Sequence, residues 1–353
     1  MAKEIPDDMT FGEIWEEPDE RDYTLDMIIK RPPEVPEEFW YEYPYPIKNQ
    51  GGVGSCVAQT LTSIREVNYH RKGEEKLFSP GFTYACRVEV NTNHMGPGMV
   101  AGAAVKEMGK VGAVLQDDFP WYEEMPDLYY NHFEPNKAEL IEKAGEYRIA
   151  EPHGVYARLR SLDEIFDALY VLGPTTISMV MFREYEDPPW SENDYRMTPP
   201  VEGTARGRHM MTVLGWKKDA FIVKNSWGDW WKDGGYFYVP FHFWNERALN
   251  MTSYALRETW FGEEDEDLKD LVIVYGDADY PYAKRLAERL GCPLVSGETA
   301  KNKEFSAETA YIAGGNDKYL DELILTGFGE VKDLRGERLF ETVEKVKRVI
   351  DKI

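Results

Sequence analysis

The amino-acid sequence predicts a larger α+β domain followed by a small α/β domain. The chain has 353 residues, which exceeds one typical domain, and 42% of them are hydrophobic, which is enough to build buried cores. From about residue 45 to 255, helical and strand patterns alternate without a repeat, which favours an α+β arrangement. After an acidic run at residues 263–267, short strands alternate with helices, which favours a small parallel sheet of Rossmann-like type. We therefore predict an acidic, proline-rich arm over residues 1–40, a main domain over 41–262 and a small domain over 268–353.

Charge and cysteine content exclude several classes of protein. Lys and Arg total 41 against 64 Asp and Glu, so the formal net charge is −23 and a nucleic-acid partner is excluded. The three cysteines, Cys56, Cys86 and Cys292, do not make a disulfide framework, which favours a reducing compartment. No run approaches the roughly 18 apolar residues of a membrane span, and the acidic N-terminus lacks the apolar core of a signal peptide. We expect synthesis in the cytoplasm without membrane insertion.

The main domain contains a helix that starts at a cysteine and a later group of strands. Apolar residues at Val57, Leu61, Ile64 and Val67 have helical spacing, and they follow a glycine-rich turn, so a helix should begin at or beside Cys56. Three strands are expected further on, over residues 209–216, 220–225 and 235–240.

Cys56 and His209 are the candidate reactive residues. A thiol at the N-terminus of a helix lies near unpaired backbone N–H groups, which favour the thiolate. A nucleophilic cysteine needs a base and a group that orients the base. His209 opens the first of the predicted strands, and pairing with the next strand would bring Asn225 beside it.

These segments resemble the papain-like cysteine peptidases. The resemblance rests on Gln50 to Cys56, on His209 and on Asn225 to Tyr236, and it covers roughly residues 35–255. It implies a two-lobed papain-like fold. Val53 and Val57 stand where the family usually has a cysteine and a tryptophan, which places the chain nearer the disulfide-poor microbial and viral branch.

The resemblance also implies a role for each site residue. Cys56 matches the attacking thiolate, His209 the general base and acid, and Asn225 the group that orients the imidazole. Gln50 matches the side-chain donor of the oxyanion hole, and Trp227 the indole that shields the His–Asn contact and borders the substrate. We expect the sulfur and the imidazole to meet across a cleft that is open to solvent.

Three more residues are assigned to substrate binding. Gly96 and Gly98 belong to a Gly-Pro-Gly turn before a predicted helix, and this turn resembles a landmark of the papain fold. Met210 has two interpretations that remain open, an apolar subsite and an ordinary core position. The histidines lack metal-ligand spacing, so we expect neither a metal site nor a cofactor.

The implied activity is that of a cysteine-type endopeptidase that hydrolyses peptide or protein substrates through a thioester on Cys56. The alternative is a non-catalytic structural or adhesion protein that retains the scaffold. Residues 1–40 also have two interpretations, an extended arm over a surface and a cover of the groove. If they cover the groove, their deletion should raise peptidase activity.

The C-terminal domain resembles a single cell-wall-binding type 2 repeat. The resemblance rests on Val274 to Asp277, Tyr311 to Gly315 and Arg335 to Thr342. Such repeats act in threes on anionic wall polymer, so a single copy implies a homotrimer. Wall binding without an export signal suggests a virion protein released by lysis, and the alternative is an intracellular protein that borrows the fold.

Overall fold

The computed structural model describes most of the chain. The described residues are 11–17, 22–29, 34–87, 97–120, 129–149, 156–182, 195–198, 203–258, 268–275, 278–290, 292, 294–297, 307–314, 328–336 and 338–352. The chain divides into two compact units. The first unit is made of Met1–Glu17, Pro33–Ile149 and Leu159–Glu258, and the second of Pro18–Pro32, Ala150–Arg158 and Thr259–Ile353.

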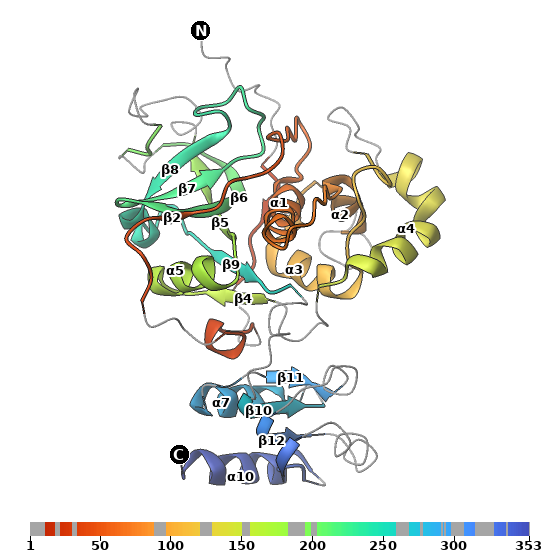
Figure 1. The fold of residues 1–353 in the computed structure, drawn as a ribbon, viewed down its shortest axis with the longest axis vertical. Coiled ribbons are helices and arrows are strands. Elements are labelled where there is room, and N and C mark those ends of the chain that lie inside the picture. Colours follow the sequence, from red (N-terminus) through yellow and green to blue (C-terminus); the bar gives the residue numbers. More distant parts are fainter. Residues whose placement is uncertain are drawn as a thin grey trace. The chain divides into compact units, whose positions relative to one another are not determined.

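The longer helices of the first unit are α1 (Cys56–Arg71), α2 (Pro80–Cys86), α3 (Ala101–Lys110), α4 (Lys137–Ala144) and α5 (Leu162–Val171). Helices α2, α3 and α4 gather on one side of the buried helix α1, whereas α5 packs against the strands (Figure 1). Short turns of helix occur at Tyr129–Phe133, Glu134–Asn136, Gly145–Tyr147 and Phe241–Asn245. Helix α1 lies between the strands and helices α2, α3 and α4 (Figure 1). It begins at Cys56, as predicted, and is buried from Cys56 to Tyr69, which explains why its apolar pattern is not confined to one face.

The second lobe of this unit is built on antiparallel strands. The strands of this lobe are β2 (Phe39–Trp40), β5 (Thr175–Phe182), β6 (Ala205–Lys217), β7 (Ala220–Lys224), β8 (Tyr236–Pro240) and β9 (Ser253–Leu256). Two short strands lie outside it, β1 (Glu13–Ile14) and β3 (Met99–Val100), and β3 directly precedes helix α3. Strand β6 pairs with β5 on one side and with β7 on the other, and β7 continues to β8. The three strands predicted after residue 205 are therefore confirmed. Their buried face packs against α1, which brings the start of that helix to β6.

Strand β1 joins the two lobes. It pairs in parallel with β3, where Glu13 lies opposite Met99 and Ile14 opposite Val100. On its other edge it pairs antiparallel with β6, where Glu13 lies opposite Arg208. A two-residue strand from the N-terminal region therefore fills the space between the lobes.

The second unit contains a four-stranded parallel sheet. Its strands are β10 (Leu268–Val274), β11 (Leu294–Ser296), β12 (Ala307–Ala313) and β13 (Phe328–Asp333), in the order β11–β10–β12–β13. Helices α7 (Tyr280–Leu290) and α10 (Leu339–Ile350) accompany them. The core of the sheet consists of Leu271, Ile273, Val295, Ala307, Ala310 and Ile312. The Rossmann-like assignment and the resemblance to a wall-binding repeat stay predictions.

Two segments from earlier in the chain also belong to the second unit. They contain the short helix at Leu25–Met27 and most of β4 (Tyr156–Leu159). The Tyr23 ring packs edge-on against Tyr156 and Tyr280, with ring centroids 5.8 and 5.9 Å away. From the sequence we predicted domains made of consecutive residues and did not assign these two segments to the second unit.

Candidate active site

The Cys56 thiol stands at the N-terminus of α1, directly after a tight turn. Gly51 in this turn has φ of +56°, a backbone conformation that glycine adopts at little cost. The peptide N–H groups of Val57, Met210 and Gly12 lie close enough to the thiol to lower its pKa. Because Met210 directly follows His209, the contact with its N–H brings Cys56 beside the part of β6 that carries the candidate base.

The His209 imidazole is held by Asn225, as predicted. Its Nε2 atom lies 2.8 Å from Asn225 Oδ1. The same Oδ1 accepts a hydrogen bond from the Ser226 N–H at 2.8 Å, which identifies that atom as the oxygen. Nε2 is therefore the donor, and the lone pair of the neutral ring is on Nδ1. Among the residues that the structure describes, Nδ1 has no hydrogen-bond partner.

Burial keeps this imidazole neutral. His209 is fully buried, and the loss of solvent lowers its pKa to about 4, although the bond to Asn225 opposes the shift. The Trp227 ring stacks on the imidazole with centroids 4.9 Å apart and an angle of 25° between the planes. Trp227 thus covers the ring, as expected.

Gln50 is fixed by a residue that the sequence did not reveal. The Ser226 hydroxyl donates a hydrogen bond of 2.6 Å to Gln50 Oε1, and the Gln50 N–H donates to the Ser226 carbonyl at 2.8 Å. With its oxygen held in this way, the Gln50 amide group directs Nε2 to the Val53 carbonyl, 3.0 Å away in the turn before Cys56. The only sequence feature that pointed to a role for Ser226 in the site was its position next to Asn225.

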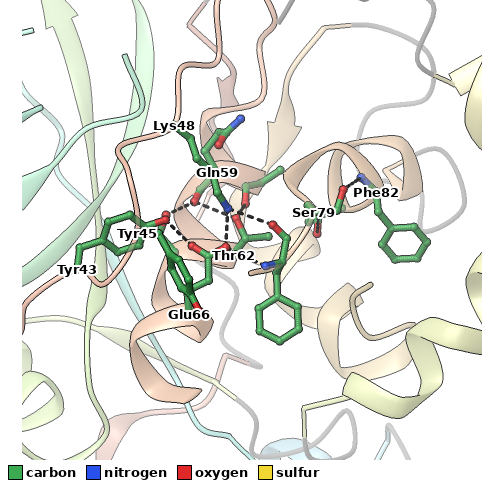
Figure 2. Close-up of polar contacts among 12 residues, drawn as sticks. Tyr43, Tyr45, Lys48, Gln59, Thr62, Glu66, Ser79 and Phe82 are labelled. Atoms are coloured by element: carbon green, nitrogen blue, oxygen red, sulfur yellow. Dashed lines mark hydrogen bonds and ion pairs between the residues drawn. The ribbon is translucent and has the colours of Figure 1, made fainter. Parts of the chain in front are cut away.

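A buried polar group anchors the chain segment that leads to Gln50 (Figure 2). Glu66, on the third turn of α1, accepts hydrogen bonds from the Tyr43 hydroxyl, the Lys48 ammonium and the Phe78 N–H. Lys48 also donates to the Phe78 carbonyl at 3.0 Å. Because Lys48 lies two residues before Gln50, this group ties Gln50 to the helix that carries Cys56.

The expectation that Cys56 faces an open cleft is wrong. Cys56 is completely buried, and burial raises its pKa to about 12 despite the N–H groups around it. The cover is the chain's own segment 11–17, which we call the cleft segment. The Gly12 carbonyl accepts a hydrogen bond of 2.8 Å from the Met99 N–H, and Gly12 lies against the backbone of Gly54. The cleft segment therefore lies directly against the thiol and the turn that precedes it.

Side chains of the cleft segment dock on both lobes. The Phe11 ring lies edge-on to His209 and Trp227, with centroids 5.8 and 6.0 Å away. Glu13 forms an ion pair with Arg208, whose Nε lies 3.2 Å from Oε2. Glu16 accepts a hydrogen bond of 2.7 Å from the Gly102 N–H in the first turn of α3, where a negative charge is favoured.

The other predicted site residues have mixed outcomes. Gly98 lies in the cleft with φ of +93°, and an added Cβ there would be 2.8 Å from the Gly12 carbonyl oxygen. Gly96 lies outside the described residues. The Met210 side chain is fully buried. Within the described ranges no group of three or more His, Cys, Asp or Glu could hold a metal ion, and no helix there could cross a membrane.

Comparisons with known proteins agree with this arrangement. The family model described as "Papain family cysteine protease" matches residues 40–255. Pro-cathepsin H of Mus musculus is 23% identical over 272 residues, which are 72% of this chain and 75% of that protein. A peptidase C1-like protein of Acanthamoeba polyphaga mimivirus is 23% identical over 60% of this chain and 69% of its own length.

A solved structure has the same fold. Xylellain, a cysteine protease from Xylella fastidiosa, superimposes with a TM-score of 0.59 at 20% identity, over 70% of this chain and 96% of its own. The family match covers more than half of the chain and includes Gln50, Cys56, His209 and Asn225. The chain therefore belongs to the papain family of cysteine proteases, which are hydrolases.

Proposed function

We propose that Cys56 and His209 are the nucleophile and the base of an endopeptidase. The observation that carries this proposal is the tautomer of His209. Its Nε2–H is directed to Asn225, so the lone pair on Nδ1 is available to accept the thiol proton.

The proposed reaction proceeds through a thioester. The Cys56 sulfur, having given its proton to Nδ1, attacks the carbonyl carbon of the substrate. The C–N bond then breaks, the amine takes the proton from His209 and leaves, and the acyl group remains on sulfur as a thioester. Water, deprotonated by His209, attacks the thioester and releases the acid and the thiol.

The negative oxygen of each tetrahedral intermediate needs donors. The Gln50 Nε2–H and the Cys56 peptide N–H supply them in this proposal, since the first is directed into the turn before Cys56 and the second is at the free end of a helix. Ser226 positions Gln50 by holding its oxygen.

The resting chain is latent, because the cleft segment covers the thiol. In this state both reacting groups are neutral, since burial raises the pKa of the thiol and lowers that of the imidazole. Displacement of the segment would restore contact with solvent and permit the ion pair to form. This supports the interpretation of the N-terminal region as a cover of the groove, although deletion of all 40 residues would also remove part of the second unit.

The direct test is hydrolysis of an unfolded protein such as casein by the full-length Gly12→Ala variant, in which overlap of the added Cβ atom with the Gly54 backbone weakens docking of the cleft segment. We expect cleavage that disappears in the Gly12→Ala/Cys56→Ala and Gly12→Ala/His209→Ala chains. Absence of cleavage and of labelling by a thiol-reactive peptide at every pH from 5 to 8 would favour the non-catalytic scaffold.

For the second unit we propose binding of an anionic cell-wall polymer as a homotrimer, with the chain acting at a cell or virion surface. The support is the sequence resemblance to a single wall-binding repeat and the need of such repeats for neighbours. Sedimentation of the full-length chain should give a trimer at micromolar concentration. A monomer would contradict the proposal.

A further inference from the structure

We propose that Arg208 forms a substrate subsite for a side chain that ends in a carboxyl or carboxamide group, and that Glu13 occupies this subsite in the resting chain. The proposal rests on the proposed function, because it takes the cleft next to Cys56 as the place where substrate binds. It adds the chemical class of side chain that the cleft selects.

The Arg208 guanidinium is a fixed, largely buried donor in the wall of the cleft. Arg208 precedes His209 on β6. Its NH1 group donates to the Asn250 carbonyl at 2.8 Å, and its NH2 group donates to the Ser178 hydroxyl at 3.2 Å. NH2 also lies 3.5 Å from the Thr252 hydroxyl. These partners belong to the body of the protein and hold the guanidinium in place.

The remaining edge of the guanidinium faces the cleft and is filled by Glu13. Nε and NH2 lie 3.2 and 3.4 Å from the two carboxyl oxygens. The Glu13 side chain is almost completely buried. The Trp15 ring covers the guanidinium, with its centroid 4.7 Å from Cζ. When the cleft segment leaves, this edge loses both oxygen partners.

A substrate would reach the same position. The cleft segment lies as an extended strand between β3 and β6, and an extended peptide in that space would meet the same two backbone edges. Gly12 lies at the thiol, and Glu13 is the next residue. The side chain that meets Arg208 therefore belongs to a substrate residue within about two positions of the bond that is cut.

The subsite favours a substrate side chain that ends in an oxygen acceptor over one that is apolar or positively charged. An apolar side chain would bury the guanidinium edge without an acceptor, and a lysine would add a second cation beside it. Burial raises the pKa of Glu13 to about 7 even beside Arg208, so ionisation gives the carboxyl group little advantage there. A carboxamide oxygen, which accepts the same bonds, is therefore included in the class.

The first test measures kcat/KM of the full-length Gly12→Ala variant at pH 6. The substrates are fluorogenic peptides that differ at one position, scanned over two residues on each side of the scissile bond with Glu, Gln, Leu or Lys. At one position we expect Glu and Gln to exceed Leu by about tenfold or more, and Lys to be cleaved least. The Gly12→Ala/Arg208→Met chain should bring the Glu-to-Leu ratio to within about threefold of one.

Arg208 is buried, so its replacement could impair folding, and a second measurement leaves it intact. Peptides with the sequence of residues 11–17 and Glu, Leu or Lys at the place of Glu13 are tested as inhibitors of the Gly12→Ala chain. We expect the Leu and Lys peptides to inhibit about tenfold more weakly than the Glu peptide. Equal inhibition constants, or a Glu-to-Leu ratio that survives Arg208→Met, would overturn the subsite.

The two proposals fail in different ways. A chain that cleaves peptides without preference at any scanned position, and whose Cys56 is labelled, refutes the subsite alone. A chain that cleaves no peptide and is not labelled at Cys56 refutes the proposed function and the subsite with it.

Discussion

Replacement of Gly12 by alanine should displace the cleft segment and expose Cys56 to solvent. A Cβ atom at this position would lie 2.7 Å from the Gly54 Cα atom and still closer to the Gly54 carbonyl oxygen. Both are backbone atoms in the turn before Cys56, so they cannot rotate away as a flexible side chain would. Overlap of this kind costs about 1–3 kcal/mol, which shifts the balance between docked and released cleft segment about 5- to 150-fold.

The assay is the rate at which iodoacetamide alkylates Cys56, located by mass spectrometry. Cys86 and Cys292 are also buried and serve as internal references. The matched control is Gly145→Ala, where the nearest atom to the added Cβ would be 3.9 Å away. We expect Gly12→Ala to react at least about fivefold faster than wild type and the control to match wild type. Equal rates in all three folded chains would refute the latent arrangement.

Three further results are expected. The docked Glu13 carboxyl has its pKa raised from 4.5 to about 7, because burial and nearby Glu16 outweigh the attraction of Arg208. Docking of the cleft segment is therefore strongest below pH 4.5 and weakens as the pH rises to 7. The Cys56 alkylation rate of the wild type, divided by that of Gly12→Ala, should rise between pH 4.5 and 7. In the Glu13→Gln variant the corresponding ratio should change little with pH. A wild-type ratio that does not depend on pH would contradict this. In the Gly12→Ala background, Gln50→Ala should lower kcat about 10²- to 10³-fold with little change in KM. If kcat/KM fell by the same factor through a higher KM alone, Gln50 would not stabilise the oxyanion. Arg65→Met should lower the free energy of unfolding by about 3–5 kcal/mol in chemical denaturation, because it leaves the buried Glu258 carboxylate without the guanidinium that now lies 2.8 Å away; a loss below 1 kcal/mol would show that the pair is dispensable.

Much of the site was predictable because its signals are local. The glycine-rich turn and the helical spacing after it predicted the position of Cys56. His209 lies on β6, and Asn225 directly follows β7, which a short turn joins to β6, so the predicted hairpin was enough to place them together.

The cover over Cys56 was not predictable in detail because it depends on distant pairing. Strand β1 has two residues, too few for an alternating pattern, and its partners lie about 85 and 195 residues further along the chain. Arg208 gave no signal in the sequence because its buried surroundings come from Glu13, Ser178 and Asn250.

The most direct test of the Cys56–His209 pair is the pH dependence of Cys56 alkylation in the Gly12→Ala chain. We predict a thiolate that persists well below the ordinary pKa of 9.0, because protonated His209 stabilises it once the cleft segment is displaced. In Gly12→Ala/His209→Ala the reactive form should appear only near or above that ordinary value. Identical pH profiles in the two chains would contradict the assignment of His209 as the partner of Cys56.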